Sequence, residues 1–124
     1  TSLRPDFMIL GYPVISFDKT IAHMGSRDNL VGKNASDELA NHFSNELQVT
    51  AQTPVTFIVH ASDDKTVPVE NSVRFYESLI KNKVPAEIHI YEKGGHGFGL
   101  HNKTTTDEWL ERLINWMKMN KIIS

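Results

Sequence analysis

Two loops of this 124-residue sequence carry side chains that could perform acid–base chemistry. The first holds Asp63 and Asp64, and the second holds His96 within a glycine-rich run. A carboxylate that hydrogen-bonds an imidazole fixes its tautomer and stabilises the imidazolium, so such a pair can serve as orienter and base in nucleophilic catalysis. Each residue alone has a plainer interpretation: an Asp before a helix is often a cap, and a His among glycines is often part of a turn.

The glycines beside the histidine favour the catalytic interpretation. They allow backbone angles closed to other residues and let a neighbouring segment approach closely. They would hold His96 at a sharp corner with no bulky neighbour between the imidazole and a substrate. We therefore expect a loop-shaping role for Gly94, Gly95 and Gly97.

Three short apolar runs are predicted to form the strands that position these loops, at residues 7–15, 54–60 and 86–91. The first run is continuous, which is typical of a strand buried on both faces, and Pro13 should end its hydrogen-bond ladder. The second run is rich in β-branched residues. The loop with the two aspartates follows the second run, and the loop with His96 follows the third.

Helices are predicted between and after these runs. One begins at Ser36, a capping hydroxyl, after a loop at residues 16–35. The next shows an apolar stripe of Val69, Val73, Tyr76 and Ile80. The last follows a capping box of Thr105 and Glu108, and its stripe consists of Trp109, Leu110, Leu113, Trp116 and Met117.

Strands that alternate with helices predict an α/β fold, with a parallel sheet and three layers in the order α/β/α. In such sheets the functional residues lie in loops beyond the carboxyl ends of the strands. The pair Asp63-Asp64 and His96 follow neighbouring strands, so an Asp and this His can lie within hydrogen-bond reach. The acid precedes the base in the chain, as in the order nucleophile, acid, base of the α/β-hydrolase scheme.

Several segments together resemble one known superfamily. They are Tyr12-Pro13-Val14, residues 60–68 (HASDDKTVP), the helix at residues 71–76 and residues 87–99 (EIHIYEKGGHGFG). They resemble the α/β-hydrolase superfamily, and more narrowly its bacterial esterase/lipase branch, with acetyl xylan esterases and proteins labelled endo-xylanase-like. The resemblance runs from Pro5 to about Met117 and is less specific over residues 16–50, a segment expected to line or cover the pocket.

This resemblance implies roles for individual residues. The family pattern of Asp, two residues and then Val-Pro selects Asp64 as the acid, and His96 matches the base. Asp63 and Pro68 would shape the loop, and His60 would pack or hydrogen-bond behind the site. The candidate walls of the acyl pocket are Tyr12, Phe17 and Phe98.

A Ser-His-Asp hydrolase also needs a serine on a Gly-x-Ser-x-Gly elbow and donors for the oxyanion. No serine here lies in that pattern, since Gly25-Ser26 has no glycine two residues later. In the family these parts precede the first strand seen here. We therefore expect residues 1–124, which start at Thr1 without a Met, to be the C-terminal part of one α/β-hydrolase domain, with its last three strands.

Two functions follow from this prediction. In the first, the chain supplies acid and base to a serine esterase acting on short acyl esters, small-molecule or carbohydrate, with acetylated xylan as one example. The open edge of the first strand would then be covered by the missing N-terminal half or by another copy. In the second, the chain is a non-catalytic binding or assembly module that has lost the nucleophile. An ester is expected rather than a glycoside, because glycosidases need two opposed carboxylates.

Composition narrows the remaining choices. The net charge is −2 with both signs interspersed, which argues against a nucleic-acid partner. No apolar run approaches the roughly 18–20 residues that span a bilayer, so no membrane segment is expected. The absence of cysteine removes disulfides and thiolate zinc sites and leaves the compartment open. The six histidines lack a metal-binding spacing such as His-Glu-x-x-His, so neither metal nor cofactor is predicted.

Overall fold

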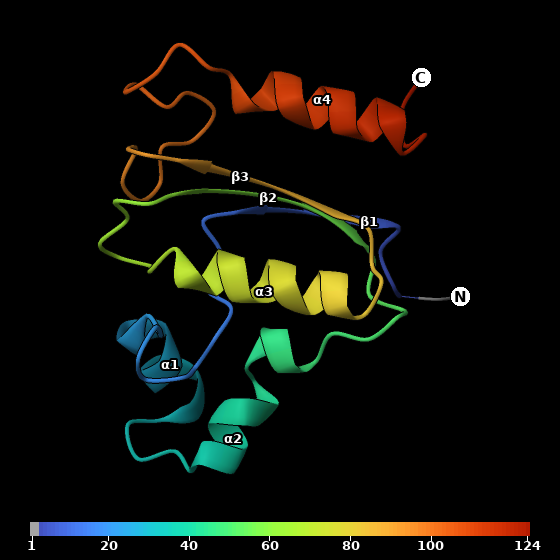
Figure 1. The fold of residues 1–124 in the computed structure, drawn as a ribbon. Helices are drawn as coiled ribbons and strands as arrows, with labels where there is room; N and C mark the ends of the chain where they lie inside the picture. Colours follow the sequence, from blue (N-terminus) through green and yellow to red (C-terminus); the bar gives the residue numbers. More distant parts are fainter. Residues whose placement is uncertain (1–2) are drawn as a thin grey trace.

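Three parallel strands form the centre of this computed structural model, which describes residues 3–124; Thr1 lies outside that range. They are β1 (Phe7–Gly11), β2 (Val55–Ala61) and β3 (Ala86–Tyr91), in the spatial order β1-β2-β3. Phe57 of β2 lies opposite Ile9 on one side and Glu87 on the other. All three strands run in one direction, so their carboxyl ends meet at the same edge of the sheet (Figure 1).

Helices cover both faces of this sheet. Helix α4 (Trp109–Met119) lies on one face, and α3 (Glu70–Lys81) lies on the other. Helices α1 (Met24–Val31) and α2 (Asp37–His42), with a 3-10 turn at Asn45–Leu47, lie beyond α3 (Figure 1). The predicted α/β class, parallel sheet and three layers are therefore confirmed. None of the helices within residues 3–124 has the length and apolar character needed to cross a membrane.

The middle strand supplies the core on both sides of the sheet. Phe57 and Val59 pack with Trp109, Leu113 and Trp116 of α4. On the opposite face Ile58 packs with a second group made of Ile15, Phe75, Leu79 and Val84. Side chains of a strand alternate between faces, and a strand buried on both faces reads as a continuous apolar run. The apolar run at residues 54–60 therefore corresponds to the most buried strand.

Two local predictions were wrong. Residues 16–35 are not all loop, since α1 lies within them; its one buried residue is Arg27, so it carries no apolar stripe that could reveal it. Thr105 accepts from the N–H of Asp107 at 3.1 Å in a turn, and α4 begins after Glu108 without a side-chain cap. The first strand is Phe7–Gly11, shorter than the apolar run, and its last bond to β2 runs from the N–H of Tyr12 to the carbonyl of Val59, so the ladder ends before Pro13 as predicted.

The buried face of α3 also differs from the predicted stripe. Ile80 is 49% exposed, whereas the buried positions are Asn71, Ser72, Phe75 and Leu79. Asn71 tolerates burial because its oxygen accepts from the N–H groups of Ile15 and Ser16, at 3.0 and 2.9 Å. Hydrogen bonds therefore offset the cost of burying polar groups at the start of this helix.

Candidate active site

The carboxyl ends of the three strands bring together the residues expected to do chemistry. Tyr12 follows β1 directly, Asp64 lies in the loop after β2, and His96 lies in the loop after β3. The last two loops lie at the left end of the sheet in Figure 1, where β1 also ends. A parallel sheet gathers its strand ends in this way, which is why residues far apart in sequence meet here.

Asp64 and His96 form a direct pair. Nδ1 of His96 lies 2.8 Å from Oδ2 of Asp64. The other carboxylate oxygen, Oδ1, accepts from the backbone N–H groups of Thr66 and Val67 at 2.8 and 2.9 Å. The Asp64 side chain is fully buried, whereas that of His96 is 35% exposed. The carboxylate is thus fixed from two directions, and the imidazole that it orients reaches the surface.

The surroundings of Asp64 favour its ionised form. Burial alone would raise the pKa of this carboxyl. The hydrogen bonds from Val67, His96 and Thr66 outweigh burial, and the pKa lies below its ordinary value of 3.8. Asp64 is therefore a carboxylate at neutral pH and accepts a hydrogen from Nδ1 of His96. Nε2 of His96 makes no hydrogen bond within residues 3–124 and can act as a base.

Hydrogen bonds also fix the two loops relative to each other. Oδ1 of Asp63 accepts from the N–H of Gly95 at 2.7 Å, which ties the first loop to the one that carries His96. A Cβ at Gly94 would lie 2.7 Å from Nδ2 of Asn102, a buried amide that donates to the carbonyl of Lys93. Gly94 therefore allows a close approach that no other residue would permit.

The remaining loop-shaping residues lie where the loops turn. Gly95 and Gly97 have φ values of 61° and 76°, in the left-handed region that favours glycine. Pro68 lies just before α3, and its carbonyl accepts from the N–H of Asn71 at 3.0 Å. These positions lie on either side of His96 and after Asp64. Residues next to both side chains in the sequence therefore determine the path of the backbone there.

Two of the three aromatic residues expected to line the acyl pocket lie against the pair. The Tyr12 ring contacts the His96 ring edge-on, with centroids 4.9 Å apart, and contacts Phe98 at 5.1 Å. Tyr12 is held by its N–H, which donates to the carbonyl of Val59 at 2.7 Å. Its positive φ of 37° costs about 1 kcal/mol.

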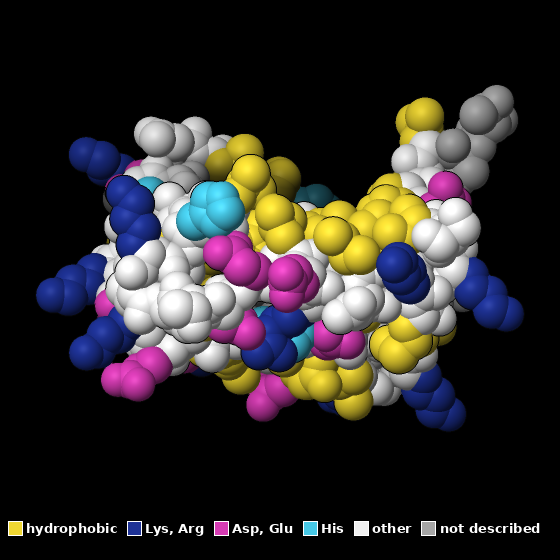
Figure 2. Space-filling model, turned by 90° about the horizontal axis from the view of Figure 1, so that it is seen from above, with side chains coloured by type: hydrophobic (Ala, Val, Ile, Leu, Met, Phe, Trp, Pro, Cys, Tyr) yellow, Lys and Arg dark blue, Asp and Glu magenta, His cyan; other side chains and the backbone are white. Residues whose placement is uncertain are grey.

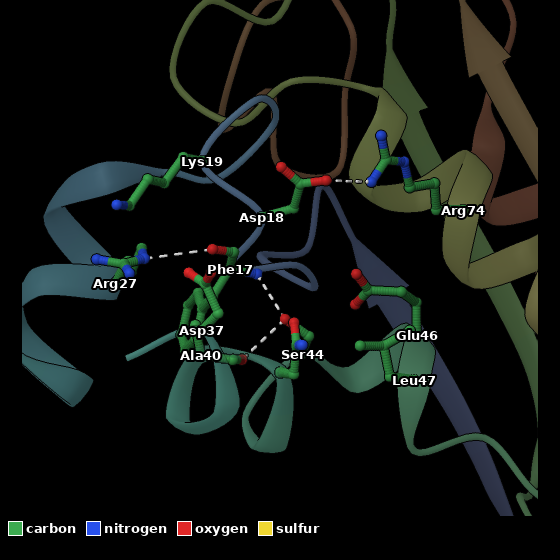
Figure 3. Close-up of a pocket in the computed structure, with 11 residues that line it drawn as sticks. Phe17, Asp18, Lys19, Arg27, Asp37, Ala40, Ser44, Glu46, Leu47 and Arg74 are labelled. Carbon is green, nitrogen blue, oxygen red and sulfur yellow. Dashed lines mark hydrogen bonds and ion pairs between the residues drawn. The ribbon is translucent and has the colours of Figure 1, made fainter. Parts of the chain in front are cut away.

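The structure does not bring Phe17 to this cluster. Its ring makes no contact with Tyr12 or His96 within the described part of the chain. Instead it lines a separate pocket of about 390 Å³ among α1, α2 and α3 (Figure 3). Its carbonyl there accepts from Nε of Arg27 at 3.2 Å, and its N–H donates to Oγ of Ser44 at 2.9 Å.

A histidine and a serine extend the site behind Asp64. His60, at the end of β2, is fully buried, as its expected packing role requires. Its Nε2 lies 3.1 Å from Oδ2 of Asp64, and its Nδ1 lies 2.7 Å from Oγ of Ser72. Burial lowers the pKa of His60, which keeps the ring neutral. Ser72 was not foreseen; its one signal is that it shares a helix face with Phe75 and Leu79.

The arrangement can supply a general base oriented by a buried carboxylate, and a nucleophile is required for it to act on. Within residues 3–124, no group of three or more His, Cys, Asp or Glu side chains could hold a metal ion. The site thus consists of the hydrogen-bonded pair Asp64 and His96, with His60 bonded to the same carboxylate and Asp63 bonded to the loop of His96.

A comparison of the sequence with known protein families agrees with the fold and the site described above. Residues 10–121, which include every residue of the site, match the sequence profile of the prolyl oligopeptidase family. The chain belongs to the prolyl oligopeptidase family. Its members have the α/β-hydrolase fold, so the resemblance to that superfamily is confirmed.

Two curated relatives support the narrower resemblance. The chain is 39% identical over 106 residues to endo-1,4-beta-xylanase B of Butyrivibrio fibrisolvens, covering 86% of this chain and 16% of that protein. It is 36% identical over 121 residues to an acetylxylan esterase of Xylanibacter ruminicola, covering 94% of this chain and 25% of that protein. This member of the prolyl oligopeptidase family thus spans a quarter or less of the curated relatives that it matches.

A solved structure gives the same picture. The chain superimposes on an acetyl ester-xyloside bifunctional hydrolase from Caldicellulosiruptor lactoaceticus with a TM-score of 0.92 and 42% identity. The superposition covers 98% of this chain and 44% of that one. This agreement confirms the α/β-hydrolase fold of the described residues, which correspond to less than half of that structure.

Proposed function

We propose that this chain supplies the acid and the base of a serine carboxylic-ester hydrolase, Asp64 and His96, and that the serine lies upstream in the full-length protein. The observation that carries the proposal is the 2.8 Å contact between Oδ2 of a buried, ionised Asp64 and Nδ1 of a partly exposed His96. This is the relation between orienter and base in a Ser-His-Asp triad.

In the proposed reaction, the serine Oγ attacks the carbonyl carbon of the ester while Nε2 of His96 takes the hydroxyl proton. Asp64 accepts the Nδ1 hydrogen bond throughout and stabilises the imidazolium. When the tetrahedral intermediate breaks down, the alcohol leaves with the proton from Nε2, and an acyl-serine remains. Water, deprotonated by His96, then attacks the acyl carbon, and the carboxylic acid and free serine are released.

The proposed substrate is an ester of a short acyl group, with acetylated xylan or another carbohydrate as the alcohol part. Tyr12 and Phe98, which lie against each other beside His96, would form a small apolar wall for the acyl group. Two relatives have names that refer to acetylxylan or to acetyl esters as the substrate. Glycoside hydrolysis requires two opposed carboxylates, whereas the Asp64 side chain is fully buried behind His96.

The proposed partner of this half is the N-terminal part of the same protein, along the open edge of β1. This strand pairs with β2 alone within the described residues, and its Ile9 is 39% exposed. On the α3 side, an apolar groove of about 360 Å³ is bordered by Met8, Leu10, Val14 and Val49. Hydrophobic side chains also gather in a band on the α4 face (Figure 2). Further strands of the sheet would cover such an edge.

The test compares His96→Ala with His101→Ala in the full-length protein, using a short-chain nitrophenyl ester. His101 is the matched control, because its side chain is 74% exposed and pairs with Glu108 away from Asp64. We expect His96→Ala to lose at least about 10³-fold in kcat/KM and His101→Ala to keep the parent rate. Equal rates for the parent protein and His96→Ala would reject the assignment.

A second candidate function is a non-catalytic binding or assembly module with the same fold. The observation in its favour is that no serine in this sequence lies in a Gly-x-Ser-x-Gly pattern. A fluorophosphonate probe distinguishes the two, because it labels an activated serine covalently. Labelling of the full-length protein supports the esterase, and the module predicts none.

A further inference from the structure

The hydrogen bonds behind Asp64 define the protonation of His60. Its Nε2 faces two acceptors, Oδ2 of Asp64 at 3.1 Å and the carbonyl of Val67 at 3.0 Å, so Nε2 carries the hydrogen. In the neutral ring, Nδ1 is then an acceptor, and the hydroxyl of Ser72, 2.7 Å away, donates to it. A single tautomer satisfies every polar atom of the ring.

This ring is enclosed and fully bonded. His60 and Ser72 are both 0% exposed, so each would be costly to bury without partners. The titratable groups that face His60 are Asp64 and His96, and burial keeps the imidazole neutral beside them. A neutral donor at this position binds the carboxylate without cancelling its charge.

Both imidazoles bind the same carboxylate oxygen. Oδ2 of Asp64 accepts from Nε2 of His60 and from Nδ1 of His96, while Oδ1 accepts from two backbone amides. Four donors therefore surround one carboxylate and fix its rotation. Two donors share Oδ2. The hydrogen bond from His60 therefore weakens the electrostatic attraction between this oxygen and His96.

We propose that His60 is a positioning residue of the acid–base pair: its Nε2–H, fixed by the two acceptors that face it, holds Oδ2 of Asp64 in line with His96, and the Ser72 hydroxyl donates to the free Nδ1. The inference rests on the proposed esterase function. His60 touches neither substrate nor nucleophile, so its loss alters the turnover step through Asp64 and leaves substrate binding unchanged.

Removal of the Nε2 donor has two expected consequences. The carboxylate gains a free acceptor and rotational freedom, so His96 is aligned less often and kcat falls. The charge on Oδ2 is also no longer shared, so the protonated form of the catalytic imidazole is better stabilised. The acid limb of the kcat/KM profile therefore moves to higher pH.

The test is a matched pair, His60→Gln and His60→Asn, in the full-length protein. The glutamine amide nitrogen can occupy the place of Nε2 and donate to Asp64, whereas the asparagine amide reaches only the place of Nδ1. We expect His60→Gln to keep at least about a third of the parent kcat. His60→Asn should lose about tenfold, the effect of one hydrogen bond to an ionised group, with KM unchanged and the acid limb moved upward.

The outcomes separate a positioning role from a structural one. A role in packing alone predicts that both variants lose activity in proportion to their loss of melting temperature, with the acid limb unmoved, and that result overturns the proposal. If neither variant folds, the tautomer of His60 in the parent protein decides, read from the ¹⁵N shifts of its ring: a hydrogen on Nε2 supports the proposal, and a hydrogen on Nδ1 overturns it, because Nε2 would then have nothing to donate to Asp64. Parent-like activity of His96→Ala would instead reject the esterase function itself.

Discussion

Asp64→Asn is the substitution that probes the proposed pair most sharply, because it keeps size and shape and changes only charge and donor pattern. The carboxylate of Asp64 faces donors on both oxygens: two backbone amides at Oδ1, and Nε2 of His60 with Nδ1 of His96 at Oδ2. If the asparagine keeps its oxygen toward the backbone amides of Thr66 and Val67, its NH₂ group faces the ring N–H groups of His60 and His96. Donors then face donors.

The magnitude follows from this conflict of donors. The nearer imidazole, 2.8 Å away, can relieve it only by moving its hydrogen from Nδ1 to Nε2. An Nε2 that carries hydrogen cannot take a proton from the serine. In a Ser-His-Asp triad the wrong tautomer lowers kcat by about 10⁴-fold, which is about 5.4 kcal/mol in activation free energy. The reverse orientation of the amide is worse, since its NH₂ group would meet the N–H groups of Thr66 and Val67.

The assay is steady-state cleavage of a nitrophenyl acetate by the full-length protein, measured below the melting temperature of each variant. Asp63→Asn is the matched control, because it makes the same chemical change one residue away. The control keeps an amide oxygen that can accept from the N–H of Gly95. A folded Asp64→Asn variant that retained a tenth of the parent kcat would refute the assignment of Asp64 as the acid.

Three further predictions concern the loops and the acid. Gly94→Ala should lower the free energy of unfolding by about 2–4 kcal/mol in a denaturant titration, because its Cβ would meet Asn102 at 2.7 Å; a loss below 0.5 kcal/mol would contradict the close approach. Asp63→Ala, which removes the acceptor for Gly95, should speed hydrogen exchange of that amide at least about tenfold, and Asp63→Asn should restore protection. The pKa of Asp64 lies below its unfolded value near 3.8, so its contribution to stability is present above that pH and is lost as pH falls through the folded value. Acid titration should therefore destabilise the parent more steeply than Asp64→Asn, and parallel curves would refute the lowered pKa.

The sequence predicted the elements whose pattern reflects burial. The third strand, Ala86–Tyr91, has the predicted bounds, and β2 differs by one residue at each end. β2 is a β-branched apolar run, as a strand buried on both faces requires. In β3 the apolar residues Ile88 and Ile90 alternate with Glu87 and His89. The stripe of α4 was also predicted correctly, since Trp109, Leu113 and Trp116 are buried.

The failures occurred where polar contacts override the apolar pattern. Helix α1 buries Arg27, which donates to the carbonyl of Phe17, so a search for apolar spacing does not find it. Helix α3 buries Asn71 and Ser72 because each has partners from other elements, partners that lie up to 56 positions away in the sequence.

The candidate site shows the same division. Strand order and loop position predicted that an aspartate of the first loop could meet His96, because parallel strands end at one edge. The choice of Asp64 over Asp63 came from the resemblance to the family pattern. The contribution of Ser72 depends on how α3 sits against β2, which no local pattern encodes. Phe17 was expected at the acyl wall, yet the path of the chain after Pro13 takes it to a pocket among the helices.

The most direct test of the central claim is the crystal structure of the full-length protein, with one distance measured in it. We predict that the Oγ of a serine in a Gly-x-Ser-x-Gly turn lies about 2.6–3.2 Å from Nε2 of His96, with the Asp64 contact at Nδ1 unchanged. An Nε2 that faces no serine hydroxyl, or faces one beyond reach of hydrogen bonding, would contradict the account.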